Sequence, residues 1–369
     1  MTEEAVLPKS PPPGGEVDEG ENAYLRTLGV EPKLRRALGF FTGSLFAIAF
    51  QGPTTGALLV TGATVAIGGP AFIWAIPLIF VFQLVLALIW AELSSHYPLT
   101  GGIYQWARRL GGELVGWMTG LFYIVAIVLV MPAVGLVMNA VFAGLFPGTF
   151  KDTESTQIIF AIITTVVAGL VMSTSVKFVA LLNSIGVVLE LVVLLGAAIA
   201  LLANHHQSLS VITKTGGAQG SGSYVTPFLI VVALVVTQLV GFETAGAFAE
   251  ETKDARIKPS QAIIAGLTGT ALVLFIFDLC LLLAVPDVGA AMKSPSLIPA
   301  VLTSAVGSWF AKLFLIGAGI AVFSTGIATL ATIVRTIYGM ARNNQLPCSR
   351  FLTKLSPRSD EPTGTIVVA

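Results

Sequence analysis

Two short stretches of the sequence place helix-breaking residues and polar side chains inside long apolar runs. The first consists of Gln51, Gly52, Pro53, Thr54, Thr55 and Gly56. The second consists of Gly241, Phe242, Glu243, Thr244, Ala245 and Gly246. Glycine and proline disfavour a helix, and proline also removes a backbone N–H donor. The N–H groups freed at one half-helix end favour a carboxylate, and the freed carbonyls at the other favour a cation. A single break is better explained as a packing kink, whereas two breaks at this separation favour a site.

Four carboxylates lie within or next to apolar runs, namely Glu92, Glu190, Glu243 and Asp278. An ionisable group at membrane depth costs about 2.5–3.5 kcal/mol on insertion scales, so each is a functional candidate by default. Glu190 has apolar neighbours on both sides, and burial there would make it able to exchange a proton. Glu243 lies inside the second break and could contact an amine or act as a gate. Glu92 is as well explained by an ion pair with a nearby arginine, and Asp278 by a hydrogen bond to a neighbouring helix.

The sequence contains no recognisable catalytic or metal-binding set. The histidines are His96, His205 and His206, and none has the spacing of a zinc site or a nucleophile signature nearby. Cys280 and Cys348 are far apart and predict no disulfide framework. The glycine-rich loop at residues 216–222 lacks the Lys-Ser/Thr ending of a phosphate-binding loop. We therefore expect no enzyme activity, no metal and no cofactor.

The composition indicates which kind of element must position these residues. The 369 residues are 55% hydrophobic and only 11% charged, whereas soluble domains carry about 25% charged residues. So few charges cannot cover a water-facing surface, and the bilayer is the solvent that tolerates an apolar one. The formal net charge of zero argues against a nucleic-acid partner. Membrane lipid is the expected surrounding.

Eight stretches are long and apolar enough to span a membrane, since a spanning helix needs roughly 20 apolar residues. They cover about residues 40–66, 70–93, 114–146, 157–175, 178–203, 225–249, 261–285 and 307–337. Residues 363–369 are similar to the start of a ninth. The two breaks fall in the first and sixth spans, as expected for two inverted repeats of five. Paired interrupted helices are the best sequence pointer to a transporter site.

Residues 1–36 precede the spans and form a separate region from the membrane domain at 37–369. Residues 1–22 are acidic and rich in proline, which predicts a disordered tail. Residues 24–38 mix leucine with arginine, which predicts an amphipathic segment on the membrane surface. With a cytoplasmic N-terminus, 16 of the 20 lysines and arginines lie on the cytoplasmic side. This bias predicts a multi-pass protein of the cell membrane with its N-terminus in the cytoplasm.

Three segments carry sequence motifs in the loops and breaks. Residues 91–98 read AELSSHYP and run into GGIYQW at 101–106; GFE at 241–243 is followed by EETK at 250–253; and YGMARN at 338–343 precedes Leu346-Pro347. In combination they resemble the amino acid–polyamine–organocation permease superfamily. Leu28-Gly29, GGPA at 68–71 and WMTG at 117–120 are similar to its branch for amino acids, GABA or choline. The resemblance extends from about Leu28 to the end of the sequence.

The resemblance implies an all-α, LeuT-like fold with inverted repeats, discontinuous helices one and six, and an incomplete second repeat. It implies a substrate between the two breaks, with its carboxylate at residues 52–56 and its amine at residues 241–243. The implied substrate contacts are Gln51, Gly52, Pro53, Thr54, Thr55, Gly56, Gly241, Phe242, Glu243 and Thr244. Glu190 stands where many relatives carry a span-five lysine, so we expect it to bind a proton or help hold a cation. Ser324 and Thr325 in span eight are the expected lining of a cation site.

These expectations combine into a secondary active permease that moves an amino acid or related amine by alternating access, coupled to H⁺ or Na⁺. The alternative is a non-transporting sensor, or a subunit that needs a partner, on the same fold. Uptake of substrate separates the two. A channel is disfavoured because broken helices paired across repeats are typical of carriers.

Overall fold

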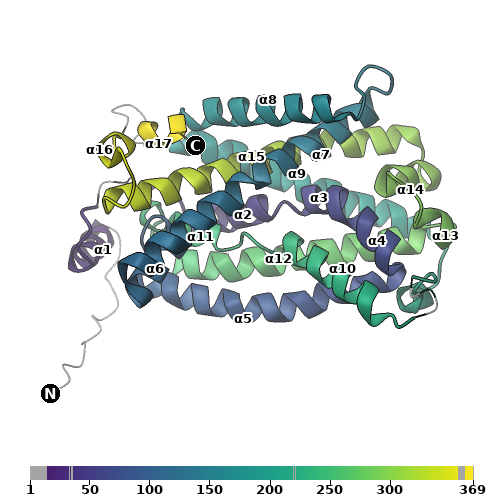
Figure 1. The fold of residues 1–369 in the computed structure, drawn as a ribbon, viewed down its shortest axis with the longest axis horizontal. Helices are drawn as coiled ribbons and strands as arrows, with labels where there is room; N and C mark the ends of the chain where they lie inside the picture. The colour runs from purple at the N-terminus through teal and green to yellow at the C-terminus, as the bar shows by residue number, and fades with distance from the viewer. Residues whose placement is uncertain are drawn as a thin grey trace.

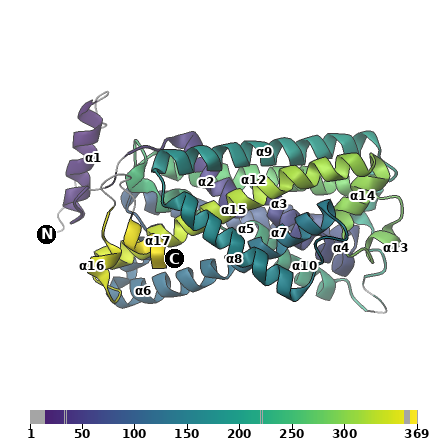
Figure 2. The same ribbon diagram turned by 90° about the horizontal axis from the view of Figure 1, so that it is seen from above.

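The helices of the protein lie side by side in one bundle along its long axis (Figures 1 and 2). This computed structural model describes residues 15–32, 34, 36–218, 220, 222–355 and 362–368. Within these ranges the chain forms helices, turns and two isolated β-bridges, without a β-strand. The first 14 residues, part of the expected disordered tail, lie outside the described residues. The all-α fold predicted from the sequence is confirmed.

Seven helical stretches of the described chain are long and apolar enough to cross a membrane. They are Phe40–Gly68, Pro70–His96, Gly102–Leu145, Glu154–Met172, Val176–Ala203, Lys258–Ala284 and Ser308–Arg342. The predicted sixth span instead contains α10 (Val225–Gln238), a break at residues 239–243, and the short α11 (Thr244–Ala247). The break explains why this stretch is too short to count as one continuous helix.

Several of these stretches are subdivided. Span one consists of α2 (Phe40–Gln51), α3 (Pro53–Gly56), the π-helical η1 (Ala57–Thr61) and α4 (Gly62–Gly68). Span two consists of η2 (Pro70–Trp74) and α5 (Ala75–His96), and span three of α6 (Gly102–Val128) and α7 (Val130–Leu145). Spans four, five, seven and eight are α8 (Glu154–Met172), α9 (Val176–Ala203), α12 (Lys258–Ala284) and α15 (Ser308–Arg342). The connecting elements are η3 (Leu209–Thr213), η4 (Ala249–Glu251), α13 (Val288–Ala291), α14 (Leu297–Ala305), α16 (Ser349–Leu352) and α17 (Thr363–Val368).

The outer helices present large apolar side chains to the surroundings. Phe82 on α5 is 64% exposed, Leu170 on α8 is 65% exposed and Ile199 on α9 is 71% exposed. Water would disfavour such a surface, whereas lipid does not. The protein is therefore a multi-pass membrane protein, as its composition predicted.

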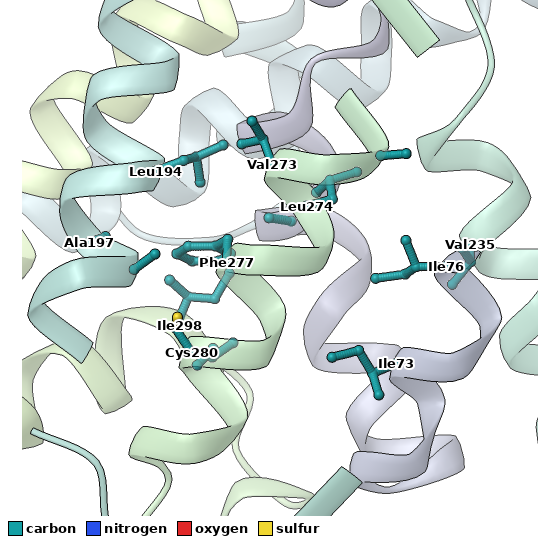
Figure 3. Close-up of a cluster of buried hydrophobic side chains, with 14 of the residues drawn as sticks. Ile73, Ile76, Leu194, Ala197, Val235, Val273, Leu274, Phe277, Cys280 and Ile298 are labelled. Carbon is teal, nitrogen blue, oxygen red and sulfur yellow. The ribbon is translucent and has the colours of Figure 1, made fainter. Parts of the chain in front are cut away.

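The interior packs spans one, five, seven and eight closely together. Leu194 of α9 meets Val273, Leu274 and Phe277 of α12 in a buried apolar cluster (Figure 3). Span one approaches α12 closely, because a Cβ on Gly266 would lie only 2.5 Å from the Cβ of Ala47. Small residues at such crossings are how membrane helices bring their backbones together.

A helix outside the bundle, α1 (Gly15–Thr27), covers residues 15–22, which were expected to be disordered. Its placement has a physical cause, because Leu25 is buried in a small cluster with Val30 and Leu99. The hydroxyl of Tyr24 donates to the carbonyl oxygen of His96 at 2.8 Å. The N–H of Ala255 donates to the carboxylate of Glu21 at 2.6 Å. The helix thus contacts the loop after span two and the loop after span six.

Candidate functional site

The break in span one is a left-handed turn at Gly52. Gly52 has φ 53° and ψ 67°, and Pro53 begins the next half-helix, residues 53–68. Proline suits the first helical position because its missing N–H would have no intrahelical partner there. A Cβ on Gly52 would lie 2.5 Å from the hydroxyl oxygen of Thr325. The sequence prediction of a discontinuous first helix is confirmed.

The break in span six lies directly against the break in span one. Gly241 has φ 104°, and a Cβ at this position would lie 1.9 Å from a ring carbon of Phe50. Gln238, the last residue of α10, packs on Gly56, whose added Cβ would lie 3.2 Å from the Gln238 side chain. The two breaks predicted from distant parts of the sequence therefore meet in space.

A cavity of about 220 Å³ adjoins these breaks. Its polar lining comes from Gln51, Thr55, Thr237, Gln238 and Thr325. The rest is apolar, with Phe50, Leu59 and Val60 from span one and Leu129, Val130 and Val134 from span three. Pockets for drug-sized ligands occupy about 300–1,000 Å³, so this one suits a smaller molecule. None of the lining residues is charged.

Two glutamines in the lining have buried amide atoms without partners. Neither Oε1 nor Nε2 of Gln238 makes a hydrogen bond within the described chain. Gln51 donates from Nε2 to the carbonyl oxygen of Ala47 at 3.1 Å, while its Oε1 has no partner there. Buried polar atoms are nearly always hydrogen-bonded, so these atoms are available to a polar ligand or to water. Sequence analysis missed Gln238, although a lone glutamine just before a helix break in an apolar run was the available signal.

Glu190 reaches from the middle of α9 into the break of span one. It is fully buried, and its Oε1 accepts a hydrogen bond from the backbone N–H of Thr54 at 2.7 Å. Thr54 is the second residue of half-helix 53–68, where N–H groups lack intrahelical acceptors. The other carboxylate oxygen, Oε2, has no hydrogen-bond partner within the described chain. The N–H group expected to receive a substrate carboxylate is thus bonded to Glu190 in this conformation.

Ser324 and Thr325 of α15 face different neighbours. The hydroxyl oxygen of Thr325 lies 3.1 Å from that of Thr55, at the cavity. Ser324 instead donates to the backbone oxygen of Asn183 at 3.2 Å, on span five. Within the described ranges no group of three or more His, Cys, Asp or Glu side chains could hold a metal ion.

Val240 of the second break lines the cavity, whereas Phe242, Glu243 and Thr244 contact other parts of the bundle and do not line it. Both carboxylate oxygens of Glu243 are bonded, Oε1 to the hydroxyl of Tyr123 at 2.9 Å and Oε2 to the N–H of Gly241 at 3.0 Å. Phe242 packs on Trp90 with ring centroids 5.1 Å apart. Thr244 accepts a hydrogen bond from Thr332 at 3.3 Å. Of the ten implied substrate contacts, Gln51, Thr55 and Gly56 line the cavity and the other seven do not.

The two remaining acidic candidates differ in burial. Asp278 is fully buried and its Oδ1 accepts from the hydroxyl of Thr61 at 3.1 Å. This is the hydrogen bond to a neighbouring helix that the sequence suggested. Glu92 is exposed, and Arg108, an arginine near it in the sequence, pairs with Glu113 at 3.2 Å.

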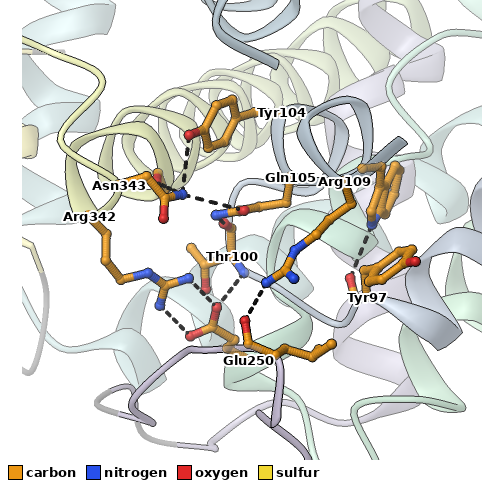
Figure 4. A network of polar contacts seen from close by, with 11 residues as sticks. Tyr97, Thr100, Tyr104, Gln105, Arg109, Glu250, Arg342 and Asn343 are labelled. Atoms are coloured by element: carbon orange, nitrogen blue, oxygen red, sulfur yellow. Dashed lines mark hydrogen bonds and ion pairs between the residues drawn. The ribbon is translucent and has the colours of Figure 1, made fainter. Parts of the chain in front are cut away.

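Two ion pairs join the helix ends on the side of the bundle where span one begins, which we call the N-terminal side. Figure 4 shows the pair of Glu250 and Arg342. Glu250 binds Arg342 through two hydrogen bonds of 2.6 and 2.8 Å and accepts from the N–H of Thr100 at 2.7 Å. Glu251 binds Arg335 in the same bidentate way, at 2.9 and 3.0 Å. The sequence motifs at 250–253 and 338–343 thus connect the exit of span six to the end of span eight.

Comparison with known families identifies the protein family to which this chain belongs. The family model for amino acid permeases matches residues 38–369. The chain belongs to the amino acid permease family. Members of this family are transporters, so the permease is a transporter and not an enzyme, as its motifs predicted.

Curated relatives extend the comparison across most of the permease. It is 22% identical to the thiamine transporter thi9 of Schizosaccharomyces pombe, over 95% of this chain and 67% of that protein. It is 26% identical to the branched-chain amino acid permease BcaP of Bacillus subtilis, over 90% of this chain and 72% of the relative. It is 25% identical to the low-affinity putrescine importer PlaP of Escherichia coli, over 79% of this chain and 65% of that protein. The permease therefore spans about two thirds of the length of these relatives.

Proposed function

We propose that this permease carries a net-neutral amino acid together with a proton, by alternating access across the cell membrane. The observation that carries the proposal is the hydrogen bond from the Thr54 N–H to Glu190 at the break of span one. A carboxylate there competes with a substrate carboxylate for the same half-helix end.

The substrate class follows from the lining of the cavity. Relatives of the permease include transporters named for branched-chain amino acids, for putrescine and for thiamine. A diamine or thiamine brings positive charge to membrane depth and needs a negative partner there. The cavity beside the breaks has no charged side chain, but it has unpartnered glutamine amides and an apolar wall. This lining favours an amino acid whose own charges cancel and whose side chain is apolar.

The coupling follows from electrostatic competition. The freed N–H groups of half-helix 53–68 attract a carboxylate, and Glu190 already contacts one of them. A substrate carboxylate in the adjoining cavity would be repelled by an ionised Glu190. A proton on Glu190 removes this repulsion, so proton and substrate favour each other's binding, and the coupling is reciprocal.

The orientation we propose puts the N-terminal side in the cytoplasm. The excess of lysine and arginine on that side of the predicted topology supports this orientation. In the described conformation the ion pairs of Glu250 and Glu251 hold helix ends together on the same side. Alternating access would require these contacts to separate when the cavity opens toward the cytoplasm.

Reconstitution of the chain in liposomes tests the coupling. We expect an inward proton gradient to drive accumulation of a neutral apolar amino acid above equilibrium. Glu190→Gln should abolish accumulation but retain exchange of labelled for unlabelled substrate, because a neutral glutamine mimics the protonated state. Accumulation driven by a sodium gradient at constant pH, or retained in Glu190→Gln, would refute proton coupling. Absence of both uptake and exchange in the wild-type chain would favour the non-transporting alternative.

A charge placed in the cavity tests the substrate class. Gln238→Glu adds a carboxylate to the neutral lining and should shift binding from neutral amino acids toward putrescine. Gln238→Ala is the matched control, because it removes the amide without adding charge and should weaken neutral amino acids without favouring putrescine. Wild-type protein that binds putrescine more tightly than leucine or valine would contradict the proposed class.

A further inference from the structure

Asp278 is a buried acid that the mechanism above does not use. It lies on α12, six residues before the helix ends at Ala284, on the side of the bundle opposite the N-terminal side. Its side chain is fully buried. Oδ1 accepts the hydrogen bond from Thr61, and Oδ2 has no hydrogen-bond partner within the described chain. A carboxylate with an open oxygen, buried without a counter-charge, is an expensive arrangement unless a proton or cation neutralises it.

The surroundings of Asp278 provide no such counter-charge. Phe277 and Cys280, its neighbours on α12, lie in the apolar cluster of Figure 3. Three of the elements packed against α12 carry charged groups. They are α5, with Glu92 and His96 at its N-terminal-side end, α9, with Lys177 and Glu190, and α15, whose Phe314 stacks on Phe277 at 6.1 Å. On α15, Lys312 is exposed at the start of the helix, and Arg335 and Arg342 are bound to Glu251 and Glu250 at its other end. No charged or titratable side chain lies on the other contacting segments, which are α2, α3, η1, α11, α14, η2 and η3. Glu190 is therefore the buried carboxylate on the elements packed against α12.

Asp278 and Glu190 contact the same half-helix of span one. Glu190 binds the N–H of Thr54 at its start, and Asp278 binds the hydroxyl of Thr61 two turns later. Seven residues correspond to about 10 Å along a helix. Residues 57–61 between them form a π-helical turn, a distortion that occurs frequently at functional sites. Movement of this half-helix would change the hydrogen bonding of both carboxylates together.

We propose that Asp278 is a second proton-binding site of the permease. It lies between Glu190 and the side of the bundle opposite the N-terminal side. The carboxyl group binds one proton while Thr61 contacts it, and it releases that proton when the half-helix moves. The only bond that forms or breaks is the O–H bond of the carboxyl group. This inference rests on the proposed proton coupling for its physiological role, but proton binding at Asp278 can be measured without transport.

Infrared difference spectroscopy of the purified chain in lipid, between acidic and alkaline pH, tests the proposal directly. Protonated carboxyl groups have a C=O stretch that ionised ones lack. We expect Asp278→Asn to remove one titrating carboxyl band and Glu190→Gln to remove a different one. Loss of no titrating band in Asp278→Asn would overturn the proposal, as would an Asp278 band that persists at every pH at which the protein is folded.

A second pair of variants keeps the test valid if Asp278→Asn does not fold. Thr61→Val removes the hydrogen bond to Asp278 and should shift the Asp278 band while leaving the Glu190 band unchanged. Thr64→Val is the matched control, because Thr64 donates to the backbone oxygen of Thr61 and not to Asp278. Equal spectra for Thr61→Val and wild type would overturn the proposal. Titrating bands in a chain that transports nothing would leave this site standing and refute the proposed function.

Discussion

The two helix breaks each have a buried glutamate beside them, but the two carboxylates are bonded differently. Glu243 lies inside the break of span six, and both of its oxygens have partners, Tyr123 and Gly241. Glu190 comes from another helix, and only one of its oxygens has a partner, the N–H of Thr54. A fully bonded carboxylate fixes local structure, whereas one with an open oxygen can accept a proton or cation. We therefore expect the break of span six to stay fixed and the break of span one to respond to protonation.

The largest expected difference concerns the glycines of the two breaks. Gly241→Ala should destabilise the protein by about 2–5 kcal/mol, because the new Cβ meets the Phe50 ring and the left-handed backbone is strained. Gly52→Ala should cost roughly 1–2 kcal/mol less, since its nearest contact is 2.5 Å, to Thr325, against 1.9 Å from Gly241 to the Phe50 ring. Thermal unfolding in detergent measures both. Gly196→Ala on α9, where nothing lies within 4 Å, is the control with no expected loss. Equal losses at Gly52 and Gly241 would contradict the comparison.

Substrate binding as a function of pH separates the two glutamates. Coupling free energies between sites are typically about 1–3 kcal/mol, or 5- to 150-fold in affinity. In wild type the affinity for a neutral amino acid should fall by an amount in this range as pH rises and Glu190 ionises. Glu190→Gln should bind equally well at acidic and alkaline pH, whereas Glu243→Gln should retain the wild-type pH dependence. Calorimetric titration measures this, and the reverse outcome would exchange the roles assigned to the two residues.

Removal of one partner of Glu243 should produce a smaller, purely structural effect. Tyr123→Phe leaves Oε1 without its donor, and we expect a loss of about 1–2 kcal/mol of stability with unchanged pH dependence of binding. Tyr224→Phe is a control of the same chemistry far from the break, since its hydroxyl donates to the carbonyl oxygen of Gly68. A change in proton coupling in Tyr123→Phe would mean that Glu243 also titrates during transport.

The smallest effect is expected where the cavity meets span eight. Thr55→Val removes the hydroxyl contact with Thr325 and should cost roughly 0.5–1 kcal/mol of stability. Substrate affinity should decrease as well, because Thr55 is one of the polar side chains of the lining. Unchanged affinity, measured by the same titration, would place the substrate elsewhere.

The sequence predicted the elements better than the directions of their side chains. Long apolar runs and the Gly-Pro and Gly-Phe-Glu interruptions were sufficient for the spans and for both breaks, because lipid and backbone hydrogen bonding leave few alternatives. The same patterns could not predict the direction of the Glu243 side chain. It was expected to face an amine, but it bonds Tyr123 of span three. Which face of a helix points inward depends on tertiary packing, and the apolar runs are too uniform to show it. Gln238 is different, because a glutamine next to the break in an apolar run was a signal that the sequence did contain.

The helix α1 illustrates another limit. Its short run of polar and acidic residues predicts disorder when considered alone. The partner that stabilises it, a cluster with Leu99, is more than 70 residues away in the sequence. Local composition contains no information about a packing partner so distant in the sequence.

The contacts of α1 also set an order of events during synthesis. The ribosome makes this helix first, yet its partners are the loop at His96 and the loop at Ala255. Domains and segments acquire structure as they emerge, from the N-terminus onward, so α1 must wait at the membrane surface until the first six spans have been inserted. Its docking then joins loops from the two halves of the bundle. A helix made before every span is thus placed only after six of them, and its attachment marks the completion of both breaks.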